Sequence, residues 1–280
     1  MCNLEEQSRK IRALTLESIH SIGTGHVGGS LSIADVLTCL YYGGLMRVDP
    51  QQPRMEGRDR LVVSKGHAGP AVYATLASKG FFDPKELLTL NRFGTMLPSH
   101  CDMNKTPGVD MTAGSLGQGI SCAVGIAIAE KIKKSNAKIY CILGDGESQE
   151  GQVWEAAMLA AYKNLNNLIV FTDYNKMQLD GILDDVESLG NLKEKWKAFG
   201  WHVEEIDGHD HKAIMQAVQN AWLCVDRPTM ILLDTIKGKG VKEIEAMGYA
   251  NHSMTLTDEL FNRAMAEPVS YTHLTLPTSD

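Results

Sequence analysis

The sequence lacks any run of about 18 apolar residues and any excess of basic residues, and these two absences already exclude classes of protein. Without such an apolar run, we expect no segment that spans a membrane. The net charge of −7 and the pI of 5.7 give no electrostatic basis for nucleic-acid binding. The amino terminus has no basic segment followed by an apolar one, so we predict no export signal and a cytoplasmic protein.

Cysteine is also scarce, and no Cys-x-x-Cys spacing occurs among the six. A chain of 280 residues does not need disulfides for stability, so we expect reduced thiols. Cys122 and Cys141 stand in apolar runs and are predicted to be small core residues. The 44% hydrophobic and 22% charged content is ordinary for a soluble globular protein.

Apolar strand-like runs alternate with helical patterns along most of the chain. This alternation predicts an α/β fold with a doubly wound, mostly parallel sheet and helices on both faces. Asp210 is a predicted N-cap of one helix. The expected strands are Leu61–Val63, Ile139–Leu143, Leu168–Thr172, His202–Ile206 and Met230–Thr235, and the expected helices are Leu4–Ser21, Ile33–Tyr42, Ala68–Ser78, Gln118–Lys133, Gln152–Tyr162, Leu192–Phe199 and His211–Cys224.

We expect one domain over residues 1–268 and an irregular tail over residues 269–280. The tail has no Lys or Arg and no helical period. It resembles translated sequencing adaptor, which is the interpretation we favour; a disordered native tail is the alternative. His273 lies in this segment. A native stop codon after the same tail in the source DNA would refute the adaptor interpretation.

Two polar side chains follow neighbouring predicted strands. Asp145 stands in Gly144-Asp145-Gly146 after one strand, and Asn175 follows the next. Ligands of open parallel sheets collect at the carboxyl ends of strands, so the two side chains could converge there. A carboxylate and an amide oxygen suit Mg²⁺, and glycines let backbone N–H groups approach a diphosphate. Gly-Asp-Gly alone is equally an ordinary turn.

With Asn175, the motif matches the thiamin-diphosphate fingerprint, and six blocks in order resemble the transketolase family from about Leu4 to about Ala266. Together, six blocks are far more specific than any one of them. The blocks are Thr24–Ser30, Leu61–Ala68, Leu97–His100, Pro107–Ser121, Gly144–Gly151 and Lys237–Gly240.

The resemblance assigns roles to four histidines. His26 would contact the sugar and move protons, His67 would touch the cofactor diphosphate, and His100 would bind a donor-sugar hydroxyl. His252 would contact cofactor and substrate, although Ser253 stands where the family usually has Gly. A lone histidine is more often a surface or packed residue, which is our interpretation of the others before the tail. These others are His20, His202, His209 and His211.

The resemblance also implies how the cofactor, thiamin diphosphate, and its Mg²⁺ would be held. The metal ligands would be Asp145, Asn175 and the carbonyl of Met177. Glu150 would lie at a subunit interface near the cofactor and act in catalysis, although a Glu early in a helix is also favoured by the helix dipole. The remaining cofactor contacts would be Gly114, Ser115, Leu116, Gly146 and Glu147.

In transketolases a second, pyrimidine-binding domain completes the site across a dimer interface, and we find no sequence for it here. The chain therefore looks like the amino-terminal subunit of a split transketolase, incomplete alone. We expect a two-fold heterotetramer with a carboxy-terminal subunit that carries the pyrimidine-binding domain.

The resemblance implies transfer of a two-carbon ketol unit from a ketose phosphate to an aldose phosphate. One alternative is the corresponding subunit of a related ketol transferase that acts on a modified sugar, such as a sulfosugar or a branched pentose. Others are a fragment of a full-length transketolase and a non-catalytic cofactor-binding subunit. A deoxyxylulose-phosphate synthase fits the Gly114–Gly119 and Leu97–His100 segments less well.

Overall fold

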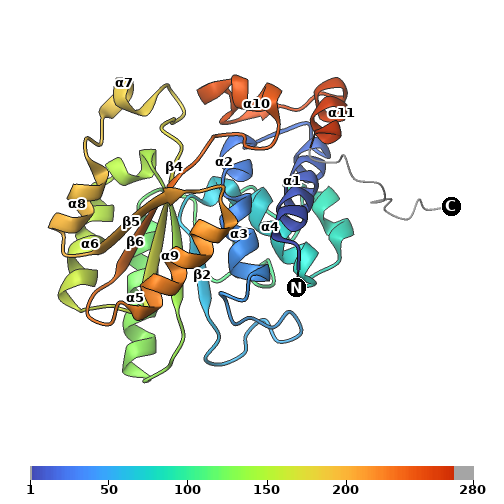
Figure 1. The fold of residues 1–280 in the computed structure, drawn as a ribbon. Helices are drawn as coiled ribbons and strands as arrows, with labels where there is room; N and C mark the ends of the chain where they lie inside the picture. Colours follow the sequence, from blue (N-terminus) through green and yellow to red (C-terminus); the bar gives the residue numbers. More distant parts are fainter. Residues whose placement is uncertain (1, 268–280) are drawn as a thin grey trace.

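The computed structural model describes residues 2–267, and a five-stranded parallel sheet lies at its centre (Figure 1). The strand order is β2-β3-β4-β6-β5. The register aligns the carboxyl ends, with Gly144 opposite Asp173 and Tyr174 opposite Asp234. The predicted fold class is therefore confirmed. The strands are β2 (Arg60–Val63), β3 (Ile139–Gly144), β4 (Leu168–Tyr174), β5 (His202–Asp207) and β6 (Thr229–Asp234).

Helices cover both faces of this sheet (Figure 1). Every helix expected from the sequence is present, with ends that differ by one residue or less. The helices are α1 (Leu4–His20), α2 (Gly28–Leu31), α3 (Ala34–Tyr42), α4 (Gly69–Lys79), α5 (Gln118–Ile132), α6 (Gly151–Tyr162), α7 (Leu183–Glu187), α8 (Leu192–Ala198), α9 (His211–Leu223), α10 (Lys242–Ala246) and α11 (Asp258–Ala266).

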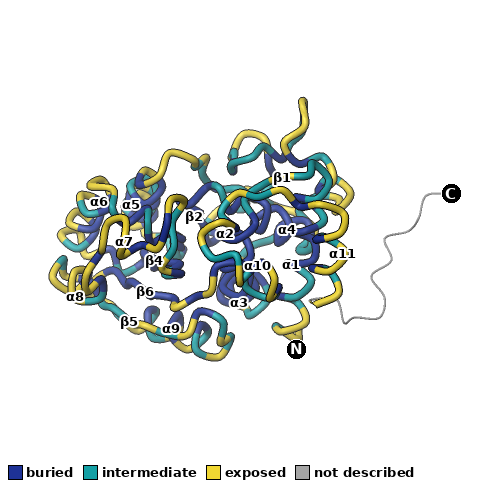
Figure 2. The backbone as a smooth tube through the Cα atoms, turned by 90° about the horizontal axis from the view of Figure 1, so that it is seen from above, coloured by how far each residue is buried: buried dark blue, intermediate teal, exposed yellow. Residues whose placement is uncertain are grey.

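Alternation along each strand divides the interior into two cores. Tyr140 and Ile142 of β3 face the core built with α1, α3, α4 and α9. Cys141 and Leu143 face the opposite core, built with α5, α6 and α8. Because successive side chains of a strand point to opposite faces, a sheet covered on both sides has strands that are apolar throughout. Figure 2 shows β2, β4 and β6 mostly as buried tube, whereas the edge strand β5 is more exposed.

Capping explains where two of the helices begin. Asp210 accepts hydrogen bonds from the backbone of Lys212 and Ala213, which confirms the predicted N-cap of α9. Thr257 caps α11 by accepting from Leu260, and Asp258 and Glu259 follow in its first turn. Such acidic first turns favour a helix, and the pattern could have predicted α11.

A second, two-stranded sheet was not expected from the sequence. Thr24–Gly25 (β1) pairs antiparallel with Met254–Thr255 (β7). Strands of two residues have no periodicity for a sequence pattern to reveal. This pairing matters because it places the segments that carry His26 and His252 side by side.

Across residues 2–267, no helix has the length and apolar character needed to cross a membrane. All six cysteines are free thiols; Cys141 is buried, whereas Cys122 is only partly buried. The tail predicted over residues 269–280 lies outside the described residues.

Candidate metal and diphosphate site

The carboxyl ends of β2, β3 and β4 open onto a cavity of about 260 Å³. Most of the residues predicted from the sequence line it. His26, His100, Gly114 and Ser115 do not line it. The predicted residues in the lining are His67, Leu116, Asp145, Gly146, Glu147, Glu150, Asn175, Met177 and His252. A larger cavity, of about 840 Å³, is lined by residues between 52 and 110 and contains none of the predicted site residues.

The four predicted histidines form one cluster beside this cavity. The ring centre of His26 lies 5.4 Å from those of His67 and His252, and 5.7 Å from that of His100. The rings of His67 and His252 are 5.0 Å apart. The β1–β7 pairing brings His252 to the other three, although more than 150 residues separate it from His100 in the sequence. The structure thus brings together four histidines to which the sequence gave separate roles.

Three of these rings are held in the neutral form. Burial lowers the pKa of His67 well below its usual value, and Lys65 adds to the effect. Burial, followed by the charge of Lys237, lowers the pKa of His252 to about 3. The pKa of His26 is also lowered, again chiefly by burial. A neutral imidazole can accept a proton at one nitrogen and donate from the other, so the cluster suits proton transfer near a hydroxyl.

Asp145 is almost fully buried, and within residues 2–267 its carboxylate forms no direct ion pair. Its oxygens accept hydrogen bonds from the backbone N–H groups of Gly146 (2.8 Å) and Lys176 (2.5 Å). Burial raises its pKa to about 6, and the neighbouring charge of Asp173 acts in the same direction. A buried anion held only by backbone amides is a favourable place for a metal ion, because the cation would offset the cost of burial.

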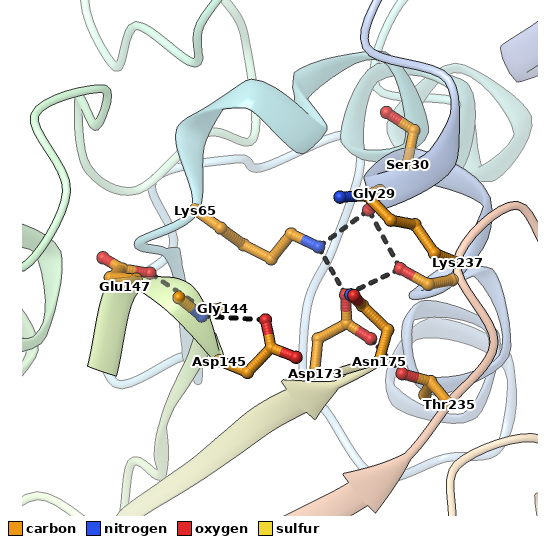
Figure 3. Close-up of polar contacts among 12 residues, drawn as sticks. Gly29, Ser30, Lys65, Gly144, Asp145, Glu147, Asp173, Asn175, Thr235 and Lys237 are labelled. Atoms are coloured by element: carbon orange, nitrogen blue, oxygen red, sulfur yellow. Dashed lines mark hydrogen bonds and ion pairs between the residues drawn. The ribbon is translucent and has the colours of Figure 1, made fainter. Parts of the chain in front are cut away.

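Asn175 is oriented by Asp173, a residue to which the sequence analysis gave no chemical role. The Asn175 amide donates its N–H to Asp173 (3.1 Å), which lies beside it in Figure 3, and its oxygen accepts from the backbone N–H of Met177 (3.2 Å). Because an amide oxygen has two lone pairs, one of them stays available to a metal ion. Asp173 also accepts from Lys65 (2.5 Å) and Ser32 (2.6 Å). Burial acts to raise the pKa of Asp173, but the Lys65 charge and the hydrogen bonds from Lys65, Ser32 and Thr235 together lower it.

Lys65 and Lys237 are the functional candidates that sequence reasoning missed. Lys65 is 1% exposed and also donates to the Gly29 carbonyl (2.9 Å). Lys237 donates to the carbonyls of Met177 (3.2 Å) and Gln178 (3.3 Å), and lies 3.1 Å from His252 Nδ1. Burial, then Lys65, lowers the pKa of Lys237 to about 8. A lysine two or three residues after a buried strand was the available signal, since buried lysines are rare.

The two predicted glutamates serve different places. Glu147 is 2% exposed, and its carboxylate accepts from Ser64 and from the backbone N–H groups of Gly117 and Gly144. Its carboxylate therefore links the glycine loop that contains Gly117 to the Gly144–Gly146 turn. Glu150 is exposed and precedes α6 at the rim of the cavity.

The glycine loop lies where α5 begins. A side-chain carbon on Gly119 would stand 2.5 Å from Ser64 Oγ, so this glycine allows α5 to pack closely on the end of β2. A side-chain carbon on Gly114 would lie 3.5 Å from the His100 ring. Ser115 is exposed, and the Leu116 side chain is 38% exposed. Close helix packing therefore accounts for Gly119, whereas Gly114 stands beside residues that are exposed and accessible to a ligand.

The donor set fits a hard divalent ion bound together with a diphosphate. A carboxylate (Asp145), an amide oxygen (Asn175) and a carbonyl (Met177) are all oxygen donors, as Mg²⁺ prefers. Within residues 2–267, no three His, Cys, Asp or Glu side chains form a group that could hold a metal without other ligands. Phosphate oxygens would complete such a shell, and the ammonium groups of Lys65 and Lys237 would balance their charge.

Comparison with known proteins gives the family. Residues 5–265 match the model for the transketolase, thiamine diphosphate binding domain. The chain is 56% identical to the 6-deoxy-6-sulfo-D-fructose transketolase subunit of Clostridium sp. (strain MSTE9), over 95% of this chain and 96% of that protein. It is 38% identical to an apulose-4-phosphate transketolase subunit of Phocaeicola vulgatus, over 94% and 93% of the two chains.

Solved structures agree. The fold is similar to that of transketolase from Campylobacter jejuni, with a TM-score of 0.88 and 31% identity. The match covers 96% of this chain. This chain spans 43% of that one, less than half of its length. The chain belongs to the transketolase family, as its thiamine diphosphate binding domain.

Proposed function

We propose that this chain is the thiamin-diphosphate- and Mg²⁺-binding subunit of a two-subunit transketolase that acts on a sulfonated ketose. The identity of 56% across nearly the whole of both chains to the 6-deoxy-6-sulfo-D-fructose transketolase subunit carries the substrate part of this proposal. The sequence analysis placed unmodified sugar phosphates first and a sulfosugar among the alternatives. The relatives favour that alternative.

Asp145, Asn175 and the Met177 carbonyl would hold the metal ion. Lys65, His67, Gly146 and Lys237 would surround the diphosphate, and the Gly114–Leu116 segment would lie along the rest of the cofactor. Thiamin diphosphate, when bound, supplies the nucleophilic carbon and the electron sink needed to break a ketose C–C bond. The remaining lone pair of the Asn175 oxygen and the buried carboxylate of Asp145, whose pKa burial raises, support this assignment.

The histidine cluster would handle the protons of the sugar. His26 and His252 are neutral, because burial lowers the pKa of both. Neutral rings can accept a hydroxyl proton when the C2–C3 bond of the ketose breaks and return it when the new C–C bond forms. His100, beside Gly114, would hydrogen-bond a donor hydroxyl. A six-carbon sulfonated donor would give up two carbons and leave a four-carbon sulfonated aldose.

The partner subunit would cover the α5–α6 face. Beyond the cavity rim at Leu116 and Glu150, this face carries large apolar side chains that are exposed to solvent. Such a patch is typical of an interface. Its members are Ile132 (77% exposed), Met158 (59%), Leu159 (42%) and Tyr162 (76%). We expect a two-fold heterotetramer in which a pyrimidine-binding domain from the partner closes the site.

Substitution of Tyr162 tests this interface. Tyr162→Glu should weaken association with the partner by about tenfold or more, because it places a charge in an apolar contact. Leu223→Glu is the matched control, since Leu223 is 79% exposed on α9. Equal association of both variants, measured by analytical ultracentrifugation, would place the partner elsewhere.

A donor panel tests the function. The chain, purified together with a pyrimidine-domain partner subunit, is assayed with Mg²⁺, thiamin diphosphate and an aldose phosphate acceptor. The donors are 6-deoxy-6-sulfo-D-fructose, fructose 6-phosphate and apulose 4-phosphate. We expect kcat/KM to be at least about tenfold higher for the sulfosugar, a difference of about 1.4 kcal/mol. A preference for either phosphorylated donor would overturn the substrate assignment while leaving the ketol-transferase function in place.

A further inference from the structure

Outside the cavity, a buried ionic group joins three distant segments of the chain. Asp35, on α3, is 3% exposed and lies between Arg12 of α1 and the loop that precedes α9. Arg12 donates to both oxygens of Asp35, at 3.1 and 2.5 Å. His209 Nδ1 lies 2.7 Å from Asp35 Oδ2. His211 Nε2 lies 3.2 Å from the other oxygen but lacks the geometry of a hydrogen bond.

The hydrogen bonds fix the tautomer of His209. The backbone N–H of Ile236 points at His209 Nε2, 2.8 Å away. A backbone N–H can only donate, so Nε2 must be the unprotonated nitrogen. The neutral ring then carries its proton on Nδ1, where the Asp35 carboxylate accepts it. Both ring nitrogens of His209 therefore have a hydrogen-bond partner, and the ring links the buried Asp35 carboxylate to the backbone amide of Ile236.

Arg12 reaches the other end of the same loop. Its Nε donates to the carbonyl of Lys239 at 2.9 Å. Asp35 thus acts on both sides of the Ile236–Lys239 segment, through His209 at one end and Arg12 at the other. Lys237 lies between these two contacts, with its ammonium group at the Met177 and Gln178 carbonyls.

Two further contacts hold the middle of this segment. Gly238 N–H donates to the Gly28 carbonyl at 3.0 Å, and Asn251 donates to the Lys237 carbonyl at 3.1 Å. They fix the backbone of Lys237 and Gly238, and the Lys239 N–H closes the turn by donating to the Ile236 carbonyl at 3.2 Å. The Ile236 N–H and the Lys239 carbonyl are held by the Asp35 group, through His209 and Arg12. Lys237 lines the cavity, whereas Asp35 and His209 do not, so a change at His209 would reach the site through this loop.

We propose that Asp35, His209 and Arg12 are positioning residues that set the Ile236–Lys239 loop and thereby place Lys237 at the diphosphate end of the cavity. This inference rests on the cofactor part of the proposed function and is independent of which sugar is used. His209, rather than Asp35, is the residue to change. Replacing Asp35 would leave the buried Arg12 charge without its partner and could unfold the chain.

Three substitutions of His209 separate its two hydrogen bonds. His209→Gln can still accept from the Ile236 N–H, because its terminal oxygen reaches the place of Nε2. His209→Asn can contact Asp35 but is too short to reach Ile236, and His209→Ala makes neither contact. His211→Gln is the matched control, because His211 neighbours the same acid but has no hydrogen bond to the loop.

The first measurement needs no cofactor. Hydrogen exchange of the Ile236 amide in the full chain should be at least about tenfold faster in His209→Asn and His209→Ala, and close to wild type in His209→Gln and His211→Gln. Nitrogen-15 NMR should show Nε2 of His209 unprotonated at pH 7.5. A protonated Nε2, or unchanged exchange in His209→Asn, would overturn the proposal.

The second measurement uses the complex of the chain with its partner, together with thiamin diphosphate and Mg²⁺. The dissociation constant of the cofactor should rise about tenfold in His209→Asn and by less than about threefold in His209→Gln. At saturating cofactor, kcat should stay within about twofold of wild type in both, as uniform loss of binding predicts. Equal losses in the Asn, Gln and Ala variants would indicate general structural damage and contradict the proposal. Absence of cofactor binding by the wild type would instead refute the proposed function, and the exchange experiment would still decide the inference.

Discussion

Asp145 and Asp173 lie at the ends of neighbouring strands and are both buried, yet their pKa values shift in opposite directions. Asp173 has Lys65, Ser32 and Thr235 as partners, and the Lys65 charge together with these hydrogen bonds lowers its pKa in spite of burial. Asp145 has only backbone amides, and burial raises its pKa to about 6. The charge of Asp173 is already balanced within the protein, whereas that of Asp145 is available for a metal ion.

The largest effect is expected at Asp173. Asp173→Asn breaks a fully buried ion pair and leaves the Lys65 charge uncompensated, so the free energy of unfolding should fall by about 3–5 kcal/mol. Urea denaturation of the full chain measures it. Lys176→Met is the control, because its ion pair with Asp234 is half exposed and should matter by less than about 1 kcal/mol. Equal losses in the two variants would mean that the buried pair of Asp173 with Lys65 stabilises the fold no more than an exposed pair does. The contrast drawn between Asp173 and Asp145 would then lose its basis.

A change at Asp145 should leave the free protein folded and abolish its response to metal. Asp145→Asn is expected to change the free energy of unfolding by less than about 1.5 kcal/mol, because no ion pair is lost. Metal-dependent binding of thiamin diphosphate should weaken at least about 100-fold, which corresponds to about 2.7 kcal/mol. Isothermal titration with and without Mg²⁺ measures this. Retained Mg²⁺-dependent binding would mean that Asp145 is not a metal ligand.

A smaller effect should appear in the pH dependence of stability. The folded-state pKa of His67 lies below its unfolded value because of burial, so the unfolded chain takes up the proton first as the pH falls below about 6.5. The free protein should therefore lose stability from pH 7 towards pH 5, by at most about 1.4 kcal/mol per pH unit for this group. His67→Asn should flatten the slope. An unchanged slope in His67→Asn would contradict the assigned neutral ring.

Much of the fold could be predicted because its signals are local. The apolar runs that became β3 and β4 are buried on both faces, and Asp210 caps the helix it was predicted to cap. The β1–β7 pair could not be predicted, because two residues have no period and the pairing joins positions about 230 residues apart. The same non-local pairing brings His252 to the other three histidines, so the complete cluster could be seen only in the structure.

At the site, sequence reasoning found the residues whose motifs are distinctive and missed those that depend on burial. Asp145, Asn175 and Met177 follow strand ends in a recognisable order, and the structure gathers them at one cavity. Lys65 was present in a quoted motif, but nothing in the sequence says that its side chain is 1% exposed and paired with Asp173. His209 was interpreted as a surface or packed residue. Its contact with Ile236 joins two loops that are separate in the sequence, so no local pattern could have revealed it.

A crystal structure of the chain with its partner, Mg²⁺ and thiamin diphosphate tests the contrast between the two aspartates most directly. We predict one metal ion bound by the Asp145 carboxylate, the Asn175 amide oxygen, the Met177 carbonyl and diphosphate oxygens, with Asp173 still paired to Lys65. A metal ion bound by Asp173, or a diphosphate bound with no contact between the metal and Asp145, would contradict the account.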